Sequence, residues 1–363
     1  MKVLFLTKYG QQAASTRHRY TQFVPFLAQH GIACHISPLL DDEYLRRKLA
    51  TGSTWHLSSL TRAFITRIAA LSRAHRYDLV VLHCEVFPYF PPILEKYLEL
   101  KKVPYYYDYD DAIFHQYDQH PSKWVRRLLG NKVRSIMKGS HCVLAGNEYL
   151  ASYARKVAPR VYVLPTVVDT TRYTPKETSP DARQPFTIGW IGSPSTAPYL
   201  RERAAALAEF CSRYPSTRVL IVGSGAIELP GVPLETRQWS METEIRDLRE
   251  FDVGIMPLPD TPWARGKSGF KLIQYMACGL PVIASPIGVN QDLVEDGRNG
   301  FLATTDEEWV GCLESLIQDP ARGVLMGKAG LEKVTSSYSL QVTAPLLLDI
   351  LTNGCQKDDQ KDP

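Results

Sequence analysis

The segment from Trp263 to Pro281, WARGKSGFKLIQYMACGLP, combines two lysines with the expected start of a helix. Apolar spacing predicts a helix over 270–278, and the glycine and proline that follow it are typical of a helix end. Lys267, Lys271 and Gln274 stand at i, i+4 and i+7, so they share a stripe if the helix begins early. Unpaired amides and the positive end of the helix dipole attract anions there. The segment therefore predicts an anion site that could hold a diphosphate, with a solvated basic patch as the alternative.

Acidic residues follow an aromatic strand at 108–111, which reads Asp-Tyr-Asp-Asp. The D-x-D pattern within it can hold a divalent cation in some proteins. We expect Asp110 or Asp111 to orient a hydroxyl or to act as its base. A helix cap by Asp111, or an ion pair with an arginine, is the alternative interpretation.

Basic and polar residues follow the first strand of the chain at Ser15, Arg17 and Arg19. Arginines at such a turn suit a phosphate-bearing ligand, although a solvated helix face explains Arg19 equally well. Weaker candidates follow two other strands: His83, Glu85, Asn147 and Glu148. They rank lower because a lone histidine is more often a structural residue than a catalyst.

Short apolar or aromatic runs that alternate with helical stretches must position these residues. The runs are 2–7, 33–39, 79–83, 105–108, 141–146 and 160–165, then 186–192, 217–225, 251–259 and 281–285. This alternation predicts an α/β fold with a doubly wound parallel sheet in each half. We expect a first domain over 1–165, a proline-rich linker over 166–185, a second domain over 186–353 and a flexible tail over 354–363. Ligands of such sheets bind outside the carboxyl ends of the strands, so the two Rossmann-like domains should face a central cleft.

Composition is that of a folded protein of two domains, with 363 residues, 44% hydrophobic and 22% charged. Seven cysteines without a C-x-x-C pair indicate reduced thiols rather than disulfides or zinc. No apolar run is long enough to span a bilayer and the start is too short for a signal peptide, so we expect a cytoplasmic protein. Residues 1–165 carry a charge of +11 and the remainder −7. The basic half could meet an anionic membrane or a phosphorylated substrate, whereas no nucleic-acid motif accompanies the charge.

The stretch SKWVRRLLGNKVRSIMKGS at 122–140 interleaves basic and apolar residues. As one amphipathic helix it could lie on an anionic membrane, at the inner face, with its apolar side in the headgroups. A helix that packs on its own sheet would show the same stripe, so both interpretations stay open.

Residues 265–303 resemble the nucleotide-sugar segment of retaining glycosyltransferases of family 4, which have the GT-B fold of two Rossmann-like domains. The resemblance continues through FTIGWIGSP (186–194), VLIVGSG (219–225), ASTRHRY (14–20) and YYDYDDAIF (106–114), and so covers most of the chain. The nearer relatives are a subgroup with lysine-rich GKxxFK segments, typical of bacterial glycoconjugate and polysaccharide biosynthesis.

The resemblance implies a donor site on the second domain. Its expected members are Gly192, Ser193, Trp239, Asp260, Lys267, Ser268, Gly269, Phe270, Lys271 and Gln274. The two lysines would neutralise the diphosphate. Gln274 falls where the second of the family's paired glutamates binds the ribose and Gly266 where the first one lies, so both acids are absent here. Asp260 could reach the sugar hydroxyls or only form a turn, and Trp239 could touch the nucleobase or only fill the core.

The implied activity is the transfer of a hexose-type sugar from a nucleotide sugar to an acceptor hydroxyl, with retention at the anomeric carbon. Lys267, Lys271, Asp110 and Asp111 would be catalytic. The expected acceptor-binding residues are Ser15, Arg17, Arg19, His83 and Glu85, facing a glycan, a lipid-linked sugar or a small molecule. We expect no metal and no cofactor beyond the UDP- or GDP-sugar co-substrate. A nucleotide-sugar epimerase of the same fold and a non-catalytic nucleotide-sugar-binding partner subunit are the alternatives, and the missing glutamates favour the latter.

Overall fold

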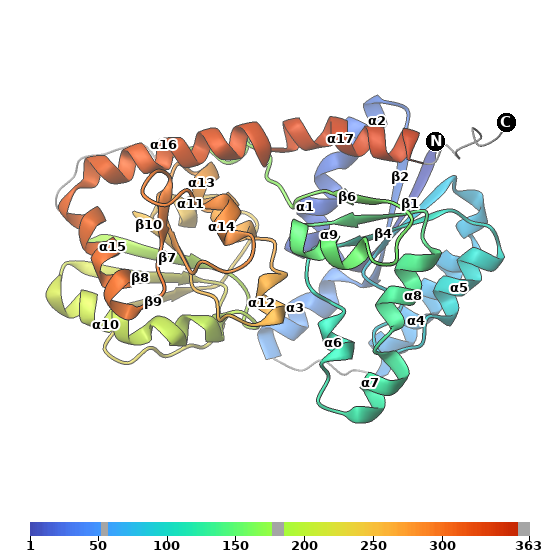
Figure 1. The fold of residues 1–363 in the computed structure, drawn as a ribbon, viewed down its shortest axis with the longest axis horizontal. Helices are drawn as coiled ribbons and strands as arrows, with labels where there is room; N and C mark the ends of the chain where they lie inside the picture. The colour runs from blue at the N-terminus through green and yellow to red at the C-terminus, as the bar shows by residue number, and fades with distance from the viewer. Residues whose placement is uncertain (52–56, 176–184, 355–363) are drawn as a thin grey trace. The chain divides into compact units, whose positions relative to one another are not determined.

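The computed structural model describes residues 1–51, 57–175 and 185–354. The chain divides into two compact units (Figure 1). The first contains Met1–Val167, Gly266–Ser268 and the chain from Leu340 on, and the second contains Val168–Arg265 and Gly269–Ser339.

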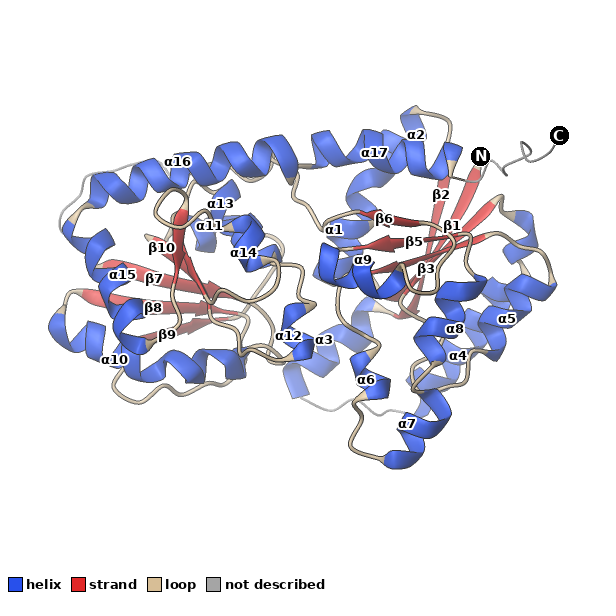
Figure 2. Cartoon of the chain, viewed as in Figure 1, coloured by secondary structure: helices blue, strands red, loops and turns tan. Residues whose placement is uncertain are grey.

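The first unit is built on a six-stranded parallel sheet with strand order β2-β1-β3-β4-β5-β6. The strands are β1 (Lys2–Tyr9), β2 (Ala33–Leu40), β3 (Leu79–His83), β4 (Tyr105–Tyr109), β5 (Cys142–Ala145) and β6 (Val161–Val163). β3, β4 and β5 are buried at every position, since helices cover both faces of a parallel sheet (Figure 2).

Helices of the first unit connect these strands. They are α1 (Ala14–Arg19), η1 (Thr21–Phe23), α2 (Val24–Gln29), α3 (Asp42–Thr51), α4 (Leu57–Ser72), η2 (Ala74–Arg76), α5 (Ile93–Leu100), α6 (His115–Asp118), α7 (Lys123–Leu129), α8 (Lys132–Gly139), α9 (Glu148–Ala154) and α17 (Leu340–Asn353). The chain reverses its strand order between β1 and β3, so the polar residues after these two strands lie at the switch point where such sheets bind ligands.

The second unit holds another six-stranded parallel sheet, with strand order β12-β11-β10-β7-β8-β9. The strands are β7 (Phe186–Ile191), β8 (Thr217–Val222), β9 (Leu234–Arg237), β10 (Val253–Met256), β11 (Val282–Ala284) and β12 (Gly300–Leu302). This is the Rossmann order, with its switch point between β7 and β10. β9 and β12 are short strands at the two edges of the sheet and lie outside the apolar runs that predict strands in the sequence.

Helices of the second unit are η3 (Ala197–Arg203), α10 (Ala204–Arg213), α11 (Glu244–Arg249), α12 (Pro262–Arg265), α13 (Phe270–Ala277), α14 (Asn290–Leu293), α15 (Asp306–Gln318) and α16 (Pro320–Ser337). One apolar core lies on each side of the sheet: α13 packs with Leu220 and Val282 on one side, and α10 with α15 on the other. The expected α/β class with two parallel sheets is confirmed.

The domain boundaries differ from the expected ones at α17. Its residues belong to the first unit, where α17 contacts α2 and η1 and the Tyr106 hydroxyl donates to the Ile350 carbonyl at 3.2 Å. Of the expected linker, Val167, Val168 and Tyr173 are buried, and 176–184 lie outside the described residues. The expected flexible tail lies outside them as well, except for Gly354.

The basic stretch at 122–140 forms two helices, α7 and α8, and not the single helix expected from its pattern. Gly130 and Asn131 separate them, in keeping with the low helix propensity of glycine. Within the described residues, we find no helix with the length and apolarity that a membrane crossing requires.

Candidate functional site

Lys271 lies beside the turn that follows β7 in the second unit. A Cβ on Gly192 would stand 2.7 Å from Lys271 Cε and 2.5 Å from the Trp190 ring, so the glycine leaves the space that the lysine side chain passes through. The Lys271 ammonium lies 5.1 Å from the Trp190 ring centroid and 3.5 Å from Thr196 Oγ1. At that length the contact with Thr196 is weak, and a cation–π contact leaves a lysine able to bind an anion.

α13 presents Lys271 because of how its ends are built. Gly269 precedes the helix in the left-handed conformation, with φ of 67°, and a Cβ there would lie 2.4 Å from Leu293 Cδ1. At the other end Gly279 has φ of 68°, and the Gly279 and Leu280 amides donate to the carbonyls of Met276 and Tyr275, which closes the helix as expected. Lys271 is therefore the second residue of an eight-residue helix, close to the positive end of the helix dipole.

The helix start also corrects the expected stripe of Lys267, Lys271 and Gln274. Because α13 begins at Phe270, Lys267 and Ser268 lie outside the helix. Gln274 is only 4% exposed and donates to the Tyr173 hydroxyl at 3.0 Å. Its contacts therefore do not support the ribose-binding role expected for this position.

A buried network connects Gln274 to Trp239. Tyr173 donates to Glu244 at 2.5 Å, and the Trp239 indole N–H donates to the other oxygen of Glu244 at 2.6 Å. Trp239 also lies beside Gly223, since a Cβ on Gly223 would be 3.1 Å from Trp239 Cβ and 2.3 Å from the Gly192 carbonyl oxygen. Tyr173 had no signal in the sequence because it stands in the stretch expected to be a linker.

Of the other residues expected at the donor, Ser193 and Asp260 lie on exposed turns, whereas Phe270 is the half-buried first residue of α13. Ser193 is exposed, with its hydroxyl 2.8 Å from that of Ser195, next to Gly192. Asp260 is exposed and accepts two hydrogen bonds from the Arg265 guanidinium at 2.7 and 3.0 Å. This pair makes Asp260 a turn residue with a local partner, which is the alternative that the sequence left open.

Arg19 proves to be a structural residue of the first unit. Its guanidinium binds both carboxylate oxygens of Asp108, and it donates to the Leu164 carbonyl and to Thr166 Oγ1, both at 3.0 Å. Arg19 and Asp108 are almost completely buried. The acceptor-binding role expected of Arg19 is not supported, because these contacts occupy the guanidinium in tying α1 to the strand ends.

Ser15 and Arg17 lie on the same helix, where Arg17 is 7% exposed and so buried as well. Ser15 is half-buried, and Arg17 donates to the Gln12 carbonyl at 2.9 Å. Lys8 at the end of β1 stands in the field of Glu85 and Asp111. Burial lowers the pKa of Lys8, but Tyr9 and the neighbouring anionic groups outweigh burial and raise it.

His83 and Asp110 come together at the ends of β3 and β4. His83 Nε2 lies 3.5 Å from Asp110 Oδ1, an ion-pair distance longer than an ordinary hydrogen bond. Burial lowers the pKa of His83, but Cys84 and Asp110 outweigh it and raise that pKa to about 10. Burial also opposes the charge of Asp110, yet His83 and Arg19 hold the pKa of this carboxyl well below its usual range. The pair therefore favours an imidazolium beside a carboxylate.

Lys267 pairs with Asp111 within the first unit. Lys267 Nζ lies 3.0 and 3.1 Å from the two oxygens of Asp111. The Asn147 side chain caps α9 and also donates to the carbonyls of Gly266 and Lys267, at 3.2 and 3.1 Å. These contacts explain why the three residues 266–268 group with the first unit.

Glu85 is a buried structural residue, contrary to the expectation that it faces an acceptor. Lys132 and the Tyr117 hydroxyl both bind Glu85 Oε2, and Lys132 also donates to the Phe87 carbonyl at 2.6 Å. Lys132 is 2% exposed, so this lysine of the basic stretch turns inward. Glu148 is exposed and pairs with Arg155.

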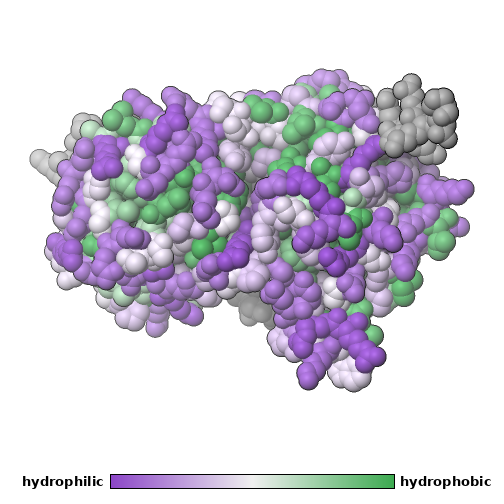
Figure 3. Space-filling model, viewed as in Figure 1, coloured by the Kyte–Doolittle hydropathy of each residue, from purple (hydrophilic) through white to green (hydrophobic). Residues whose placement is uncertain are grey.

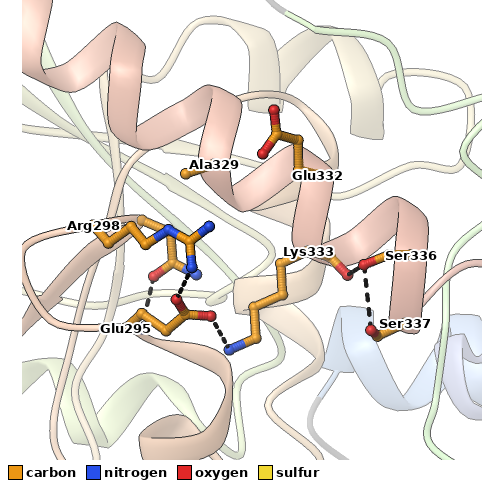
Figure 4. A pocket seen from close by; sticks show the side chains of 8 residues that line it. Glu295, Arg298, Ala329, Glu332, Lys333, Ser336 and Ser337 are labelled. Atoms are coloured by element: carbon orange, nitrogen blue, oxygen red, sulfur yellow. Dashed lines mark hydrogen bonds and ion pairs between the residues drawn. The ribbon is translucent and has the colours of Figure 1, made fainter.

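A polar pocket of about 400 Å³ lies elsewhere in the second unit, between the 295–299 turn and α16. Figure 4 shows Glu295 between the side chains of Arg298 and Lys333, which donate to it at 2.5 and 2.9 Å. The pocket contains none of the residues that the sequence singles out, and both of its cations pair with Glu295.

The two parallel sheets and the glycine-lined edge after β7 define the fold class, which is that of the GT-B glycosyltransferases. Sucrose-phosphate synthase from Thermosynechococcus elongatus matches with a TM-score of 0.68 over 97% of this chain and 98% of its own, at 15% identity. HepE from Anabaena, solved with UDP, matches with a TM-score of 0.66 over 97% of this chain and 100% of its own, at 16% identity. The same protein has also been solved with UDP-glucose.

The sequence comparisons point to the same class. Residues 186–319 match the family described as glycosyl transferases, group 1. Alpha-maltose-1-phosphate synthase of Mycolicibacterium smegmatis is 24% identical over 63% of this chain and 65% of its own length. D-inositol 3-phosphate glycosyltransferase of Rhodococcus erythropolis is 31% identical over 52% of this chain and 48% of its own. The matched part of the chain therefore spans from about half to about two thirds of these relatives.

Proposed function

We propose that this chain is a glycosyltransferase that moves a hexose-type sugar from a nucleoside diphosphate sugar to an acceptor hydroxyl. The observation that carries the proposal is the position of Lys271, at the start of α13 and beside Gly192, at the switch point of the Rossmann-ordered sheet. A diphosphate placed there would meet an ammonium group, the positive end of a helix dipole and a backbone without a Cβ in its way. The match of residues 186–319 to glycosyl transferases of group 1 supports it.

Lys271 would act chiefly on the leaving group. Charge develops on the diphosphate as the bond to the sugar breaks, and donors that are already in place stabilise that charge without rearrangement. Lys267 remains in the proposal as the second cation, but its ion pair with Asp111 competes with phosphate. Retention at the anomeric carbon, and catalysis without a metal ion or another cofactor, belong to the same proposal.

For the donor nucleotide we propose UDP or GDP. The solved complexes of HepE with UDP and UDP-glucose support a uridine nucleotide, since that protein has the same fold. A glycan, a lipid-linked sugar or a small molecule would be the acceptor, and the edge of the first unit with Ser15, Arg17, Asp110 and Asp111 would bind it. A lipid-linked acceptor would bring a cytoplasmic protein to the inner face of a membrane. Bacterial glycoconjugate or polysaccharide biosynthesis is the setting that the lysine-rich segment suggests.

A second candidate is a partner subunit that binds a nucleotide sugar without turning it over. The specific observation in its favour is Gln274, which replaces a glutamate of the family and is buried against Tyr173. This candidate and a transferase share the donor site and differ in turnover.

The test is the release of nucleoside diphosphate from UDP-glucose, UDP-N-acetylglucosamine, GDP-mannose and dTDP-glucose, followed by chromatography with and without a panel of sugar and lipid acceptors. We expect release from one nucleotide class, slowed about ten-fold or more by Lys271→Ala because a charged phosphate contact is lost. Lys328→Ala, at an exposed position of α16, is the matched control and should change nothing. Binding of a nucleotide sugar without release of nucleoside diphosphate would favour the partner subunit. Absence of both binding and release would refute the proposal.

A further inference from the structure

Three separate segments of the first unit expose large apolar and aromatic side chains. They are α4, the loop from β3 into α5, and α7. The side chains are between 40% and 74% exposed and comprise Phe64, Ile65, Tyr89, Phe90, Ile93, Trp124 and Leu128. Isolated apolar residues on a surface are ordinary, so what matters is whether these ones are contiguous.

Ring contacts join α4 to the loop, and a ring contact with His120 followed by a hydrogen bond leads from the loop to α7. The Phe64 ring stacks on Phe87 at 4.7 Å, and Phe87 meets Phe90 edge-on at 6.4 Å, which joins α4 to the loop. The Tyr89 ring lies 6.0 Å from that of His120, whose carbonyl accepts a hydrogen bond from Arg126 of α7. We call the exposed side chains of these three segments, together with the exposed basic residues among them, the α4–α7 surface.

The loop is held so that its aromatic side chains stay outside. Tyr89 has φ of 57°, in the left-handed region that bulky residues rarely adopt, and its amide donates to the Tyr117 hydroxyl at 3.0 Å. Tyr117 in turn donates to the buried Glu85, so the loop is tied to the core beneath it. Tyr89 and Phe90 are thus ordered and exposed at the same time.

α7 places its apolar and basic residues for contact with one partner. Trp124 and Leu128 stand four residues apart on one face and are 71% and 74% exposed, while Lys123 and Arg127 beside them are exposed too. Figure 3 shows hydrophilic and hydrophobic atoms side by side where α7 projects from its unit. The aromatic and aliphatic side chains that would enter a lipid interface are therefore flanked by cations.

Acidic side chains are nearly absent from the α4–α7 surface. The sequence has no Asp or Glu over 57–72, over 86–94 or over 119–147. The carboxylates close to these segments have polar partners. Glu85 binds Lys132, Glu95 accepts a hydrogen bond from the Val86 amide, and Asp118 pairs with His115. The exposed charges on α4 and α7 are those of Arg62, Lys123 and Arg127, all positive, whereas the neighbouring α5 exposes both Lys96 and Glu99.

We propose that the α4–α7 surface docks on the headgroups of an anionic phospholipid bilayer. Cations attract the anionic leaflet, and tryptophan, tyrosine and phenylalanine are the side chains that prefer the interface between headgroups and acyl chains. The proposal replaces the single basic helix at 122–140, because Lys132 is buried and the apolar residues Val133 and Ile136 of α8 are in the core. It does not depend on the donor site in the second unit.

Flotation of the full-length protein with vesicles tests the docking surface. One set contains phosphatidylcholine alone and the other about one third phosphatidylglycerol, each at low and at physiological salt. We expect binding to the anionic vesicles only, weakened by salt. Trp124→Ser/Leu128→Ser should reduce it about ten-fold or more, as should Lys123→Gln/Arg127→Gln, since both the apolar and the charged contributions are needed.

The matched control is Leu325→Ser/Leu346→Ser, which removes comparably exposed leucines from α16 and α17 and should leave vesicle binding unchanged. Lys271→Ala should also leave it unchanged, so a failure of the donor site is distinguishable from a failure of docking. No binding of the wild-type protein to anionic vesicles would overturn the proposal. The proposal would also be overturned if the protein bound an RNA oligonucleotide more tightly than the vesicles, and if only Lys123→Gln/Arg127→Gln weakened that binding.

Discussion

Arg19, the last residue of α1, and Lys271, the second residue of α13, are both basic, but their surroundings differ. Arg19 is buried and bound by a carboxylate, a carbonyl and a hydroxyl. Lys271 is half-buried, and its ammonium lies 3.5 Å from Thr196 Oγ1 and 5.1 Å from the Trp190 ring centroid. A buried cation with several polar partners stabilises the fold, whereas a half-buried lysine at a helix start stands where an anionic ligand is favoured.

Replacement of Arg19 by methionine should therefore destabilise the chain by about 3–5 kcal/mol, because it leaves the buried Asp108 carboxylate without its partner. Urea unfolding of the full chain measures the change. Arg213→Met removes an exposed arginine that binds Glu209 and Glu314 and should change stability little. If the Arg19→Met variant were as stable as the wild type but bound the acceptor more weakly, Arg19 would be an acceptor-binding residue and not a structural one.

His83 predicts a pH dependence of stability. Its pKa in the folded chain is raised to about 10, above the unfolded value of about 6.5, so the protonated imidazole stabilises the fold. That contribution is complete below about pH 6.5 and is lost as the pH rises through about 10. We expect the stability difference between wild type and His83→Gln, from urea unfolding, to shrink across that window. A difference that stays constant with pH would contradict the charged His83.

At the scale of elements, the left-handed conformation of Gly269 sets the start of α13. Only part of this helix was predictable from the sequence. The helix and its Gly279 end were predictable from apolar spacing and end signals. The left-handed conformation of Gly269 was not, because its neighbours Ser268 and Phe270 are also compatible with a helix that begins earlier. The end of α7 at Gly130 was not predictable either, because the hydrophobic periodicity of 122–140 continues across the boundary between α7 and α8.

Gly269→Ala should thus cost stability and displace Lys271. A Cβ there would be strained by the positive φ and would meet Leu293 at 2.4 Å, for a loss of about 1–2 kcal/mol or more. Gly297→Ala is the matched control, since Gly297 has φ of 77° and no atom of the described residues lies within 4 Å of its Cβ position. We expect both to lose stability in urea unfolding and Gly269→Ala alone to weaken nucleotide binding. Equal nucleotide affinity in the two variants would contradict this account of the helix start.

At the scale of the whole molecule, the last helix completes the first unit although it follows the second in the chain. The alternation of strands and helices predicted both sheets, yet it placed α17 in the second domain. Sequence order alone does not show that a C-terminal helix packs on the N-terminal unit. The contacts between side chains at the strand ends were equally hidden: Arg19 with Asp108 and Gln274 with Tyr173 join residues far apart in sequence.

The position of α17 predicts that Leu351→Ala destabilises the protein by about 2–5 kcal/mol, since Leu351 is completely buried in the first unit. Leu346→Ala on the same helix removes a side chain that is 43% exposed and should change stability by no more than about 0.5 kcal/mol. Thermal unfolding of the full-length variants checks both. Similar melting temperatures for the two would show that α17 does not complete this core.

The central claim is that the edge of the second unit binds a nucleoside diphosphate through Lys271. Isothermal titration of the full-length protein with UDP, GDP, dTDP and ADP tests it directly, with Lys271→Ala and the control Lys328→Ala in parallel. The account predicts that one nucleotide binds preferentially, about ten-fold or more weakly to Lys271→Ala and equally well to the control. Absence of binding up to about millimolar concentration, or equal affinity of wild type and Lys271→Ala, would contradict it.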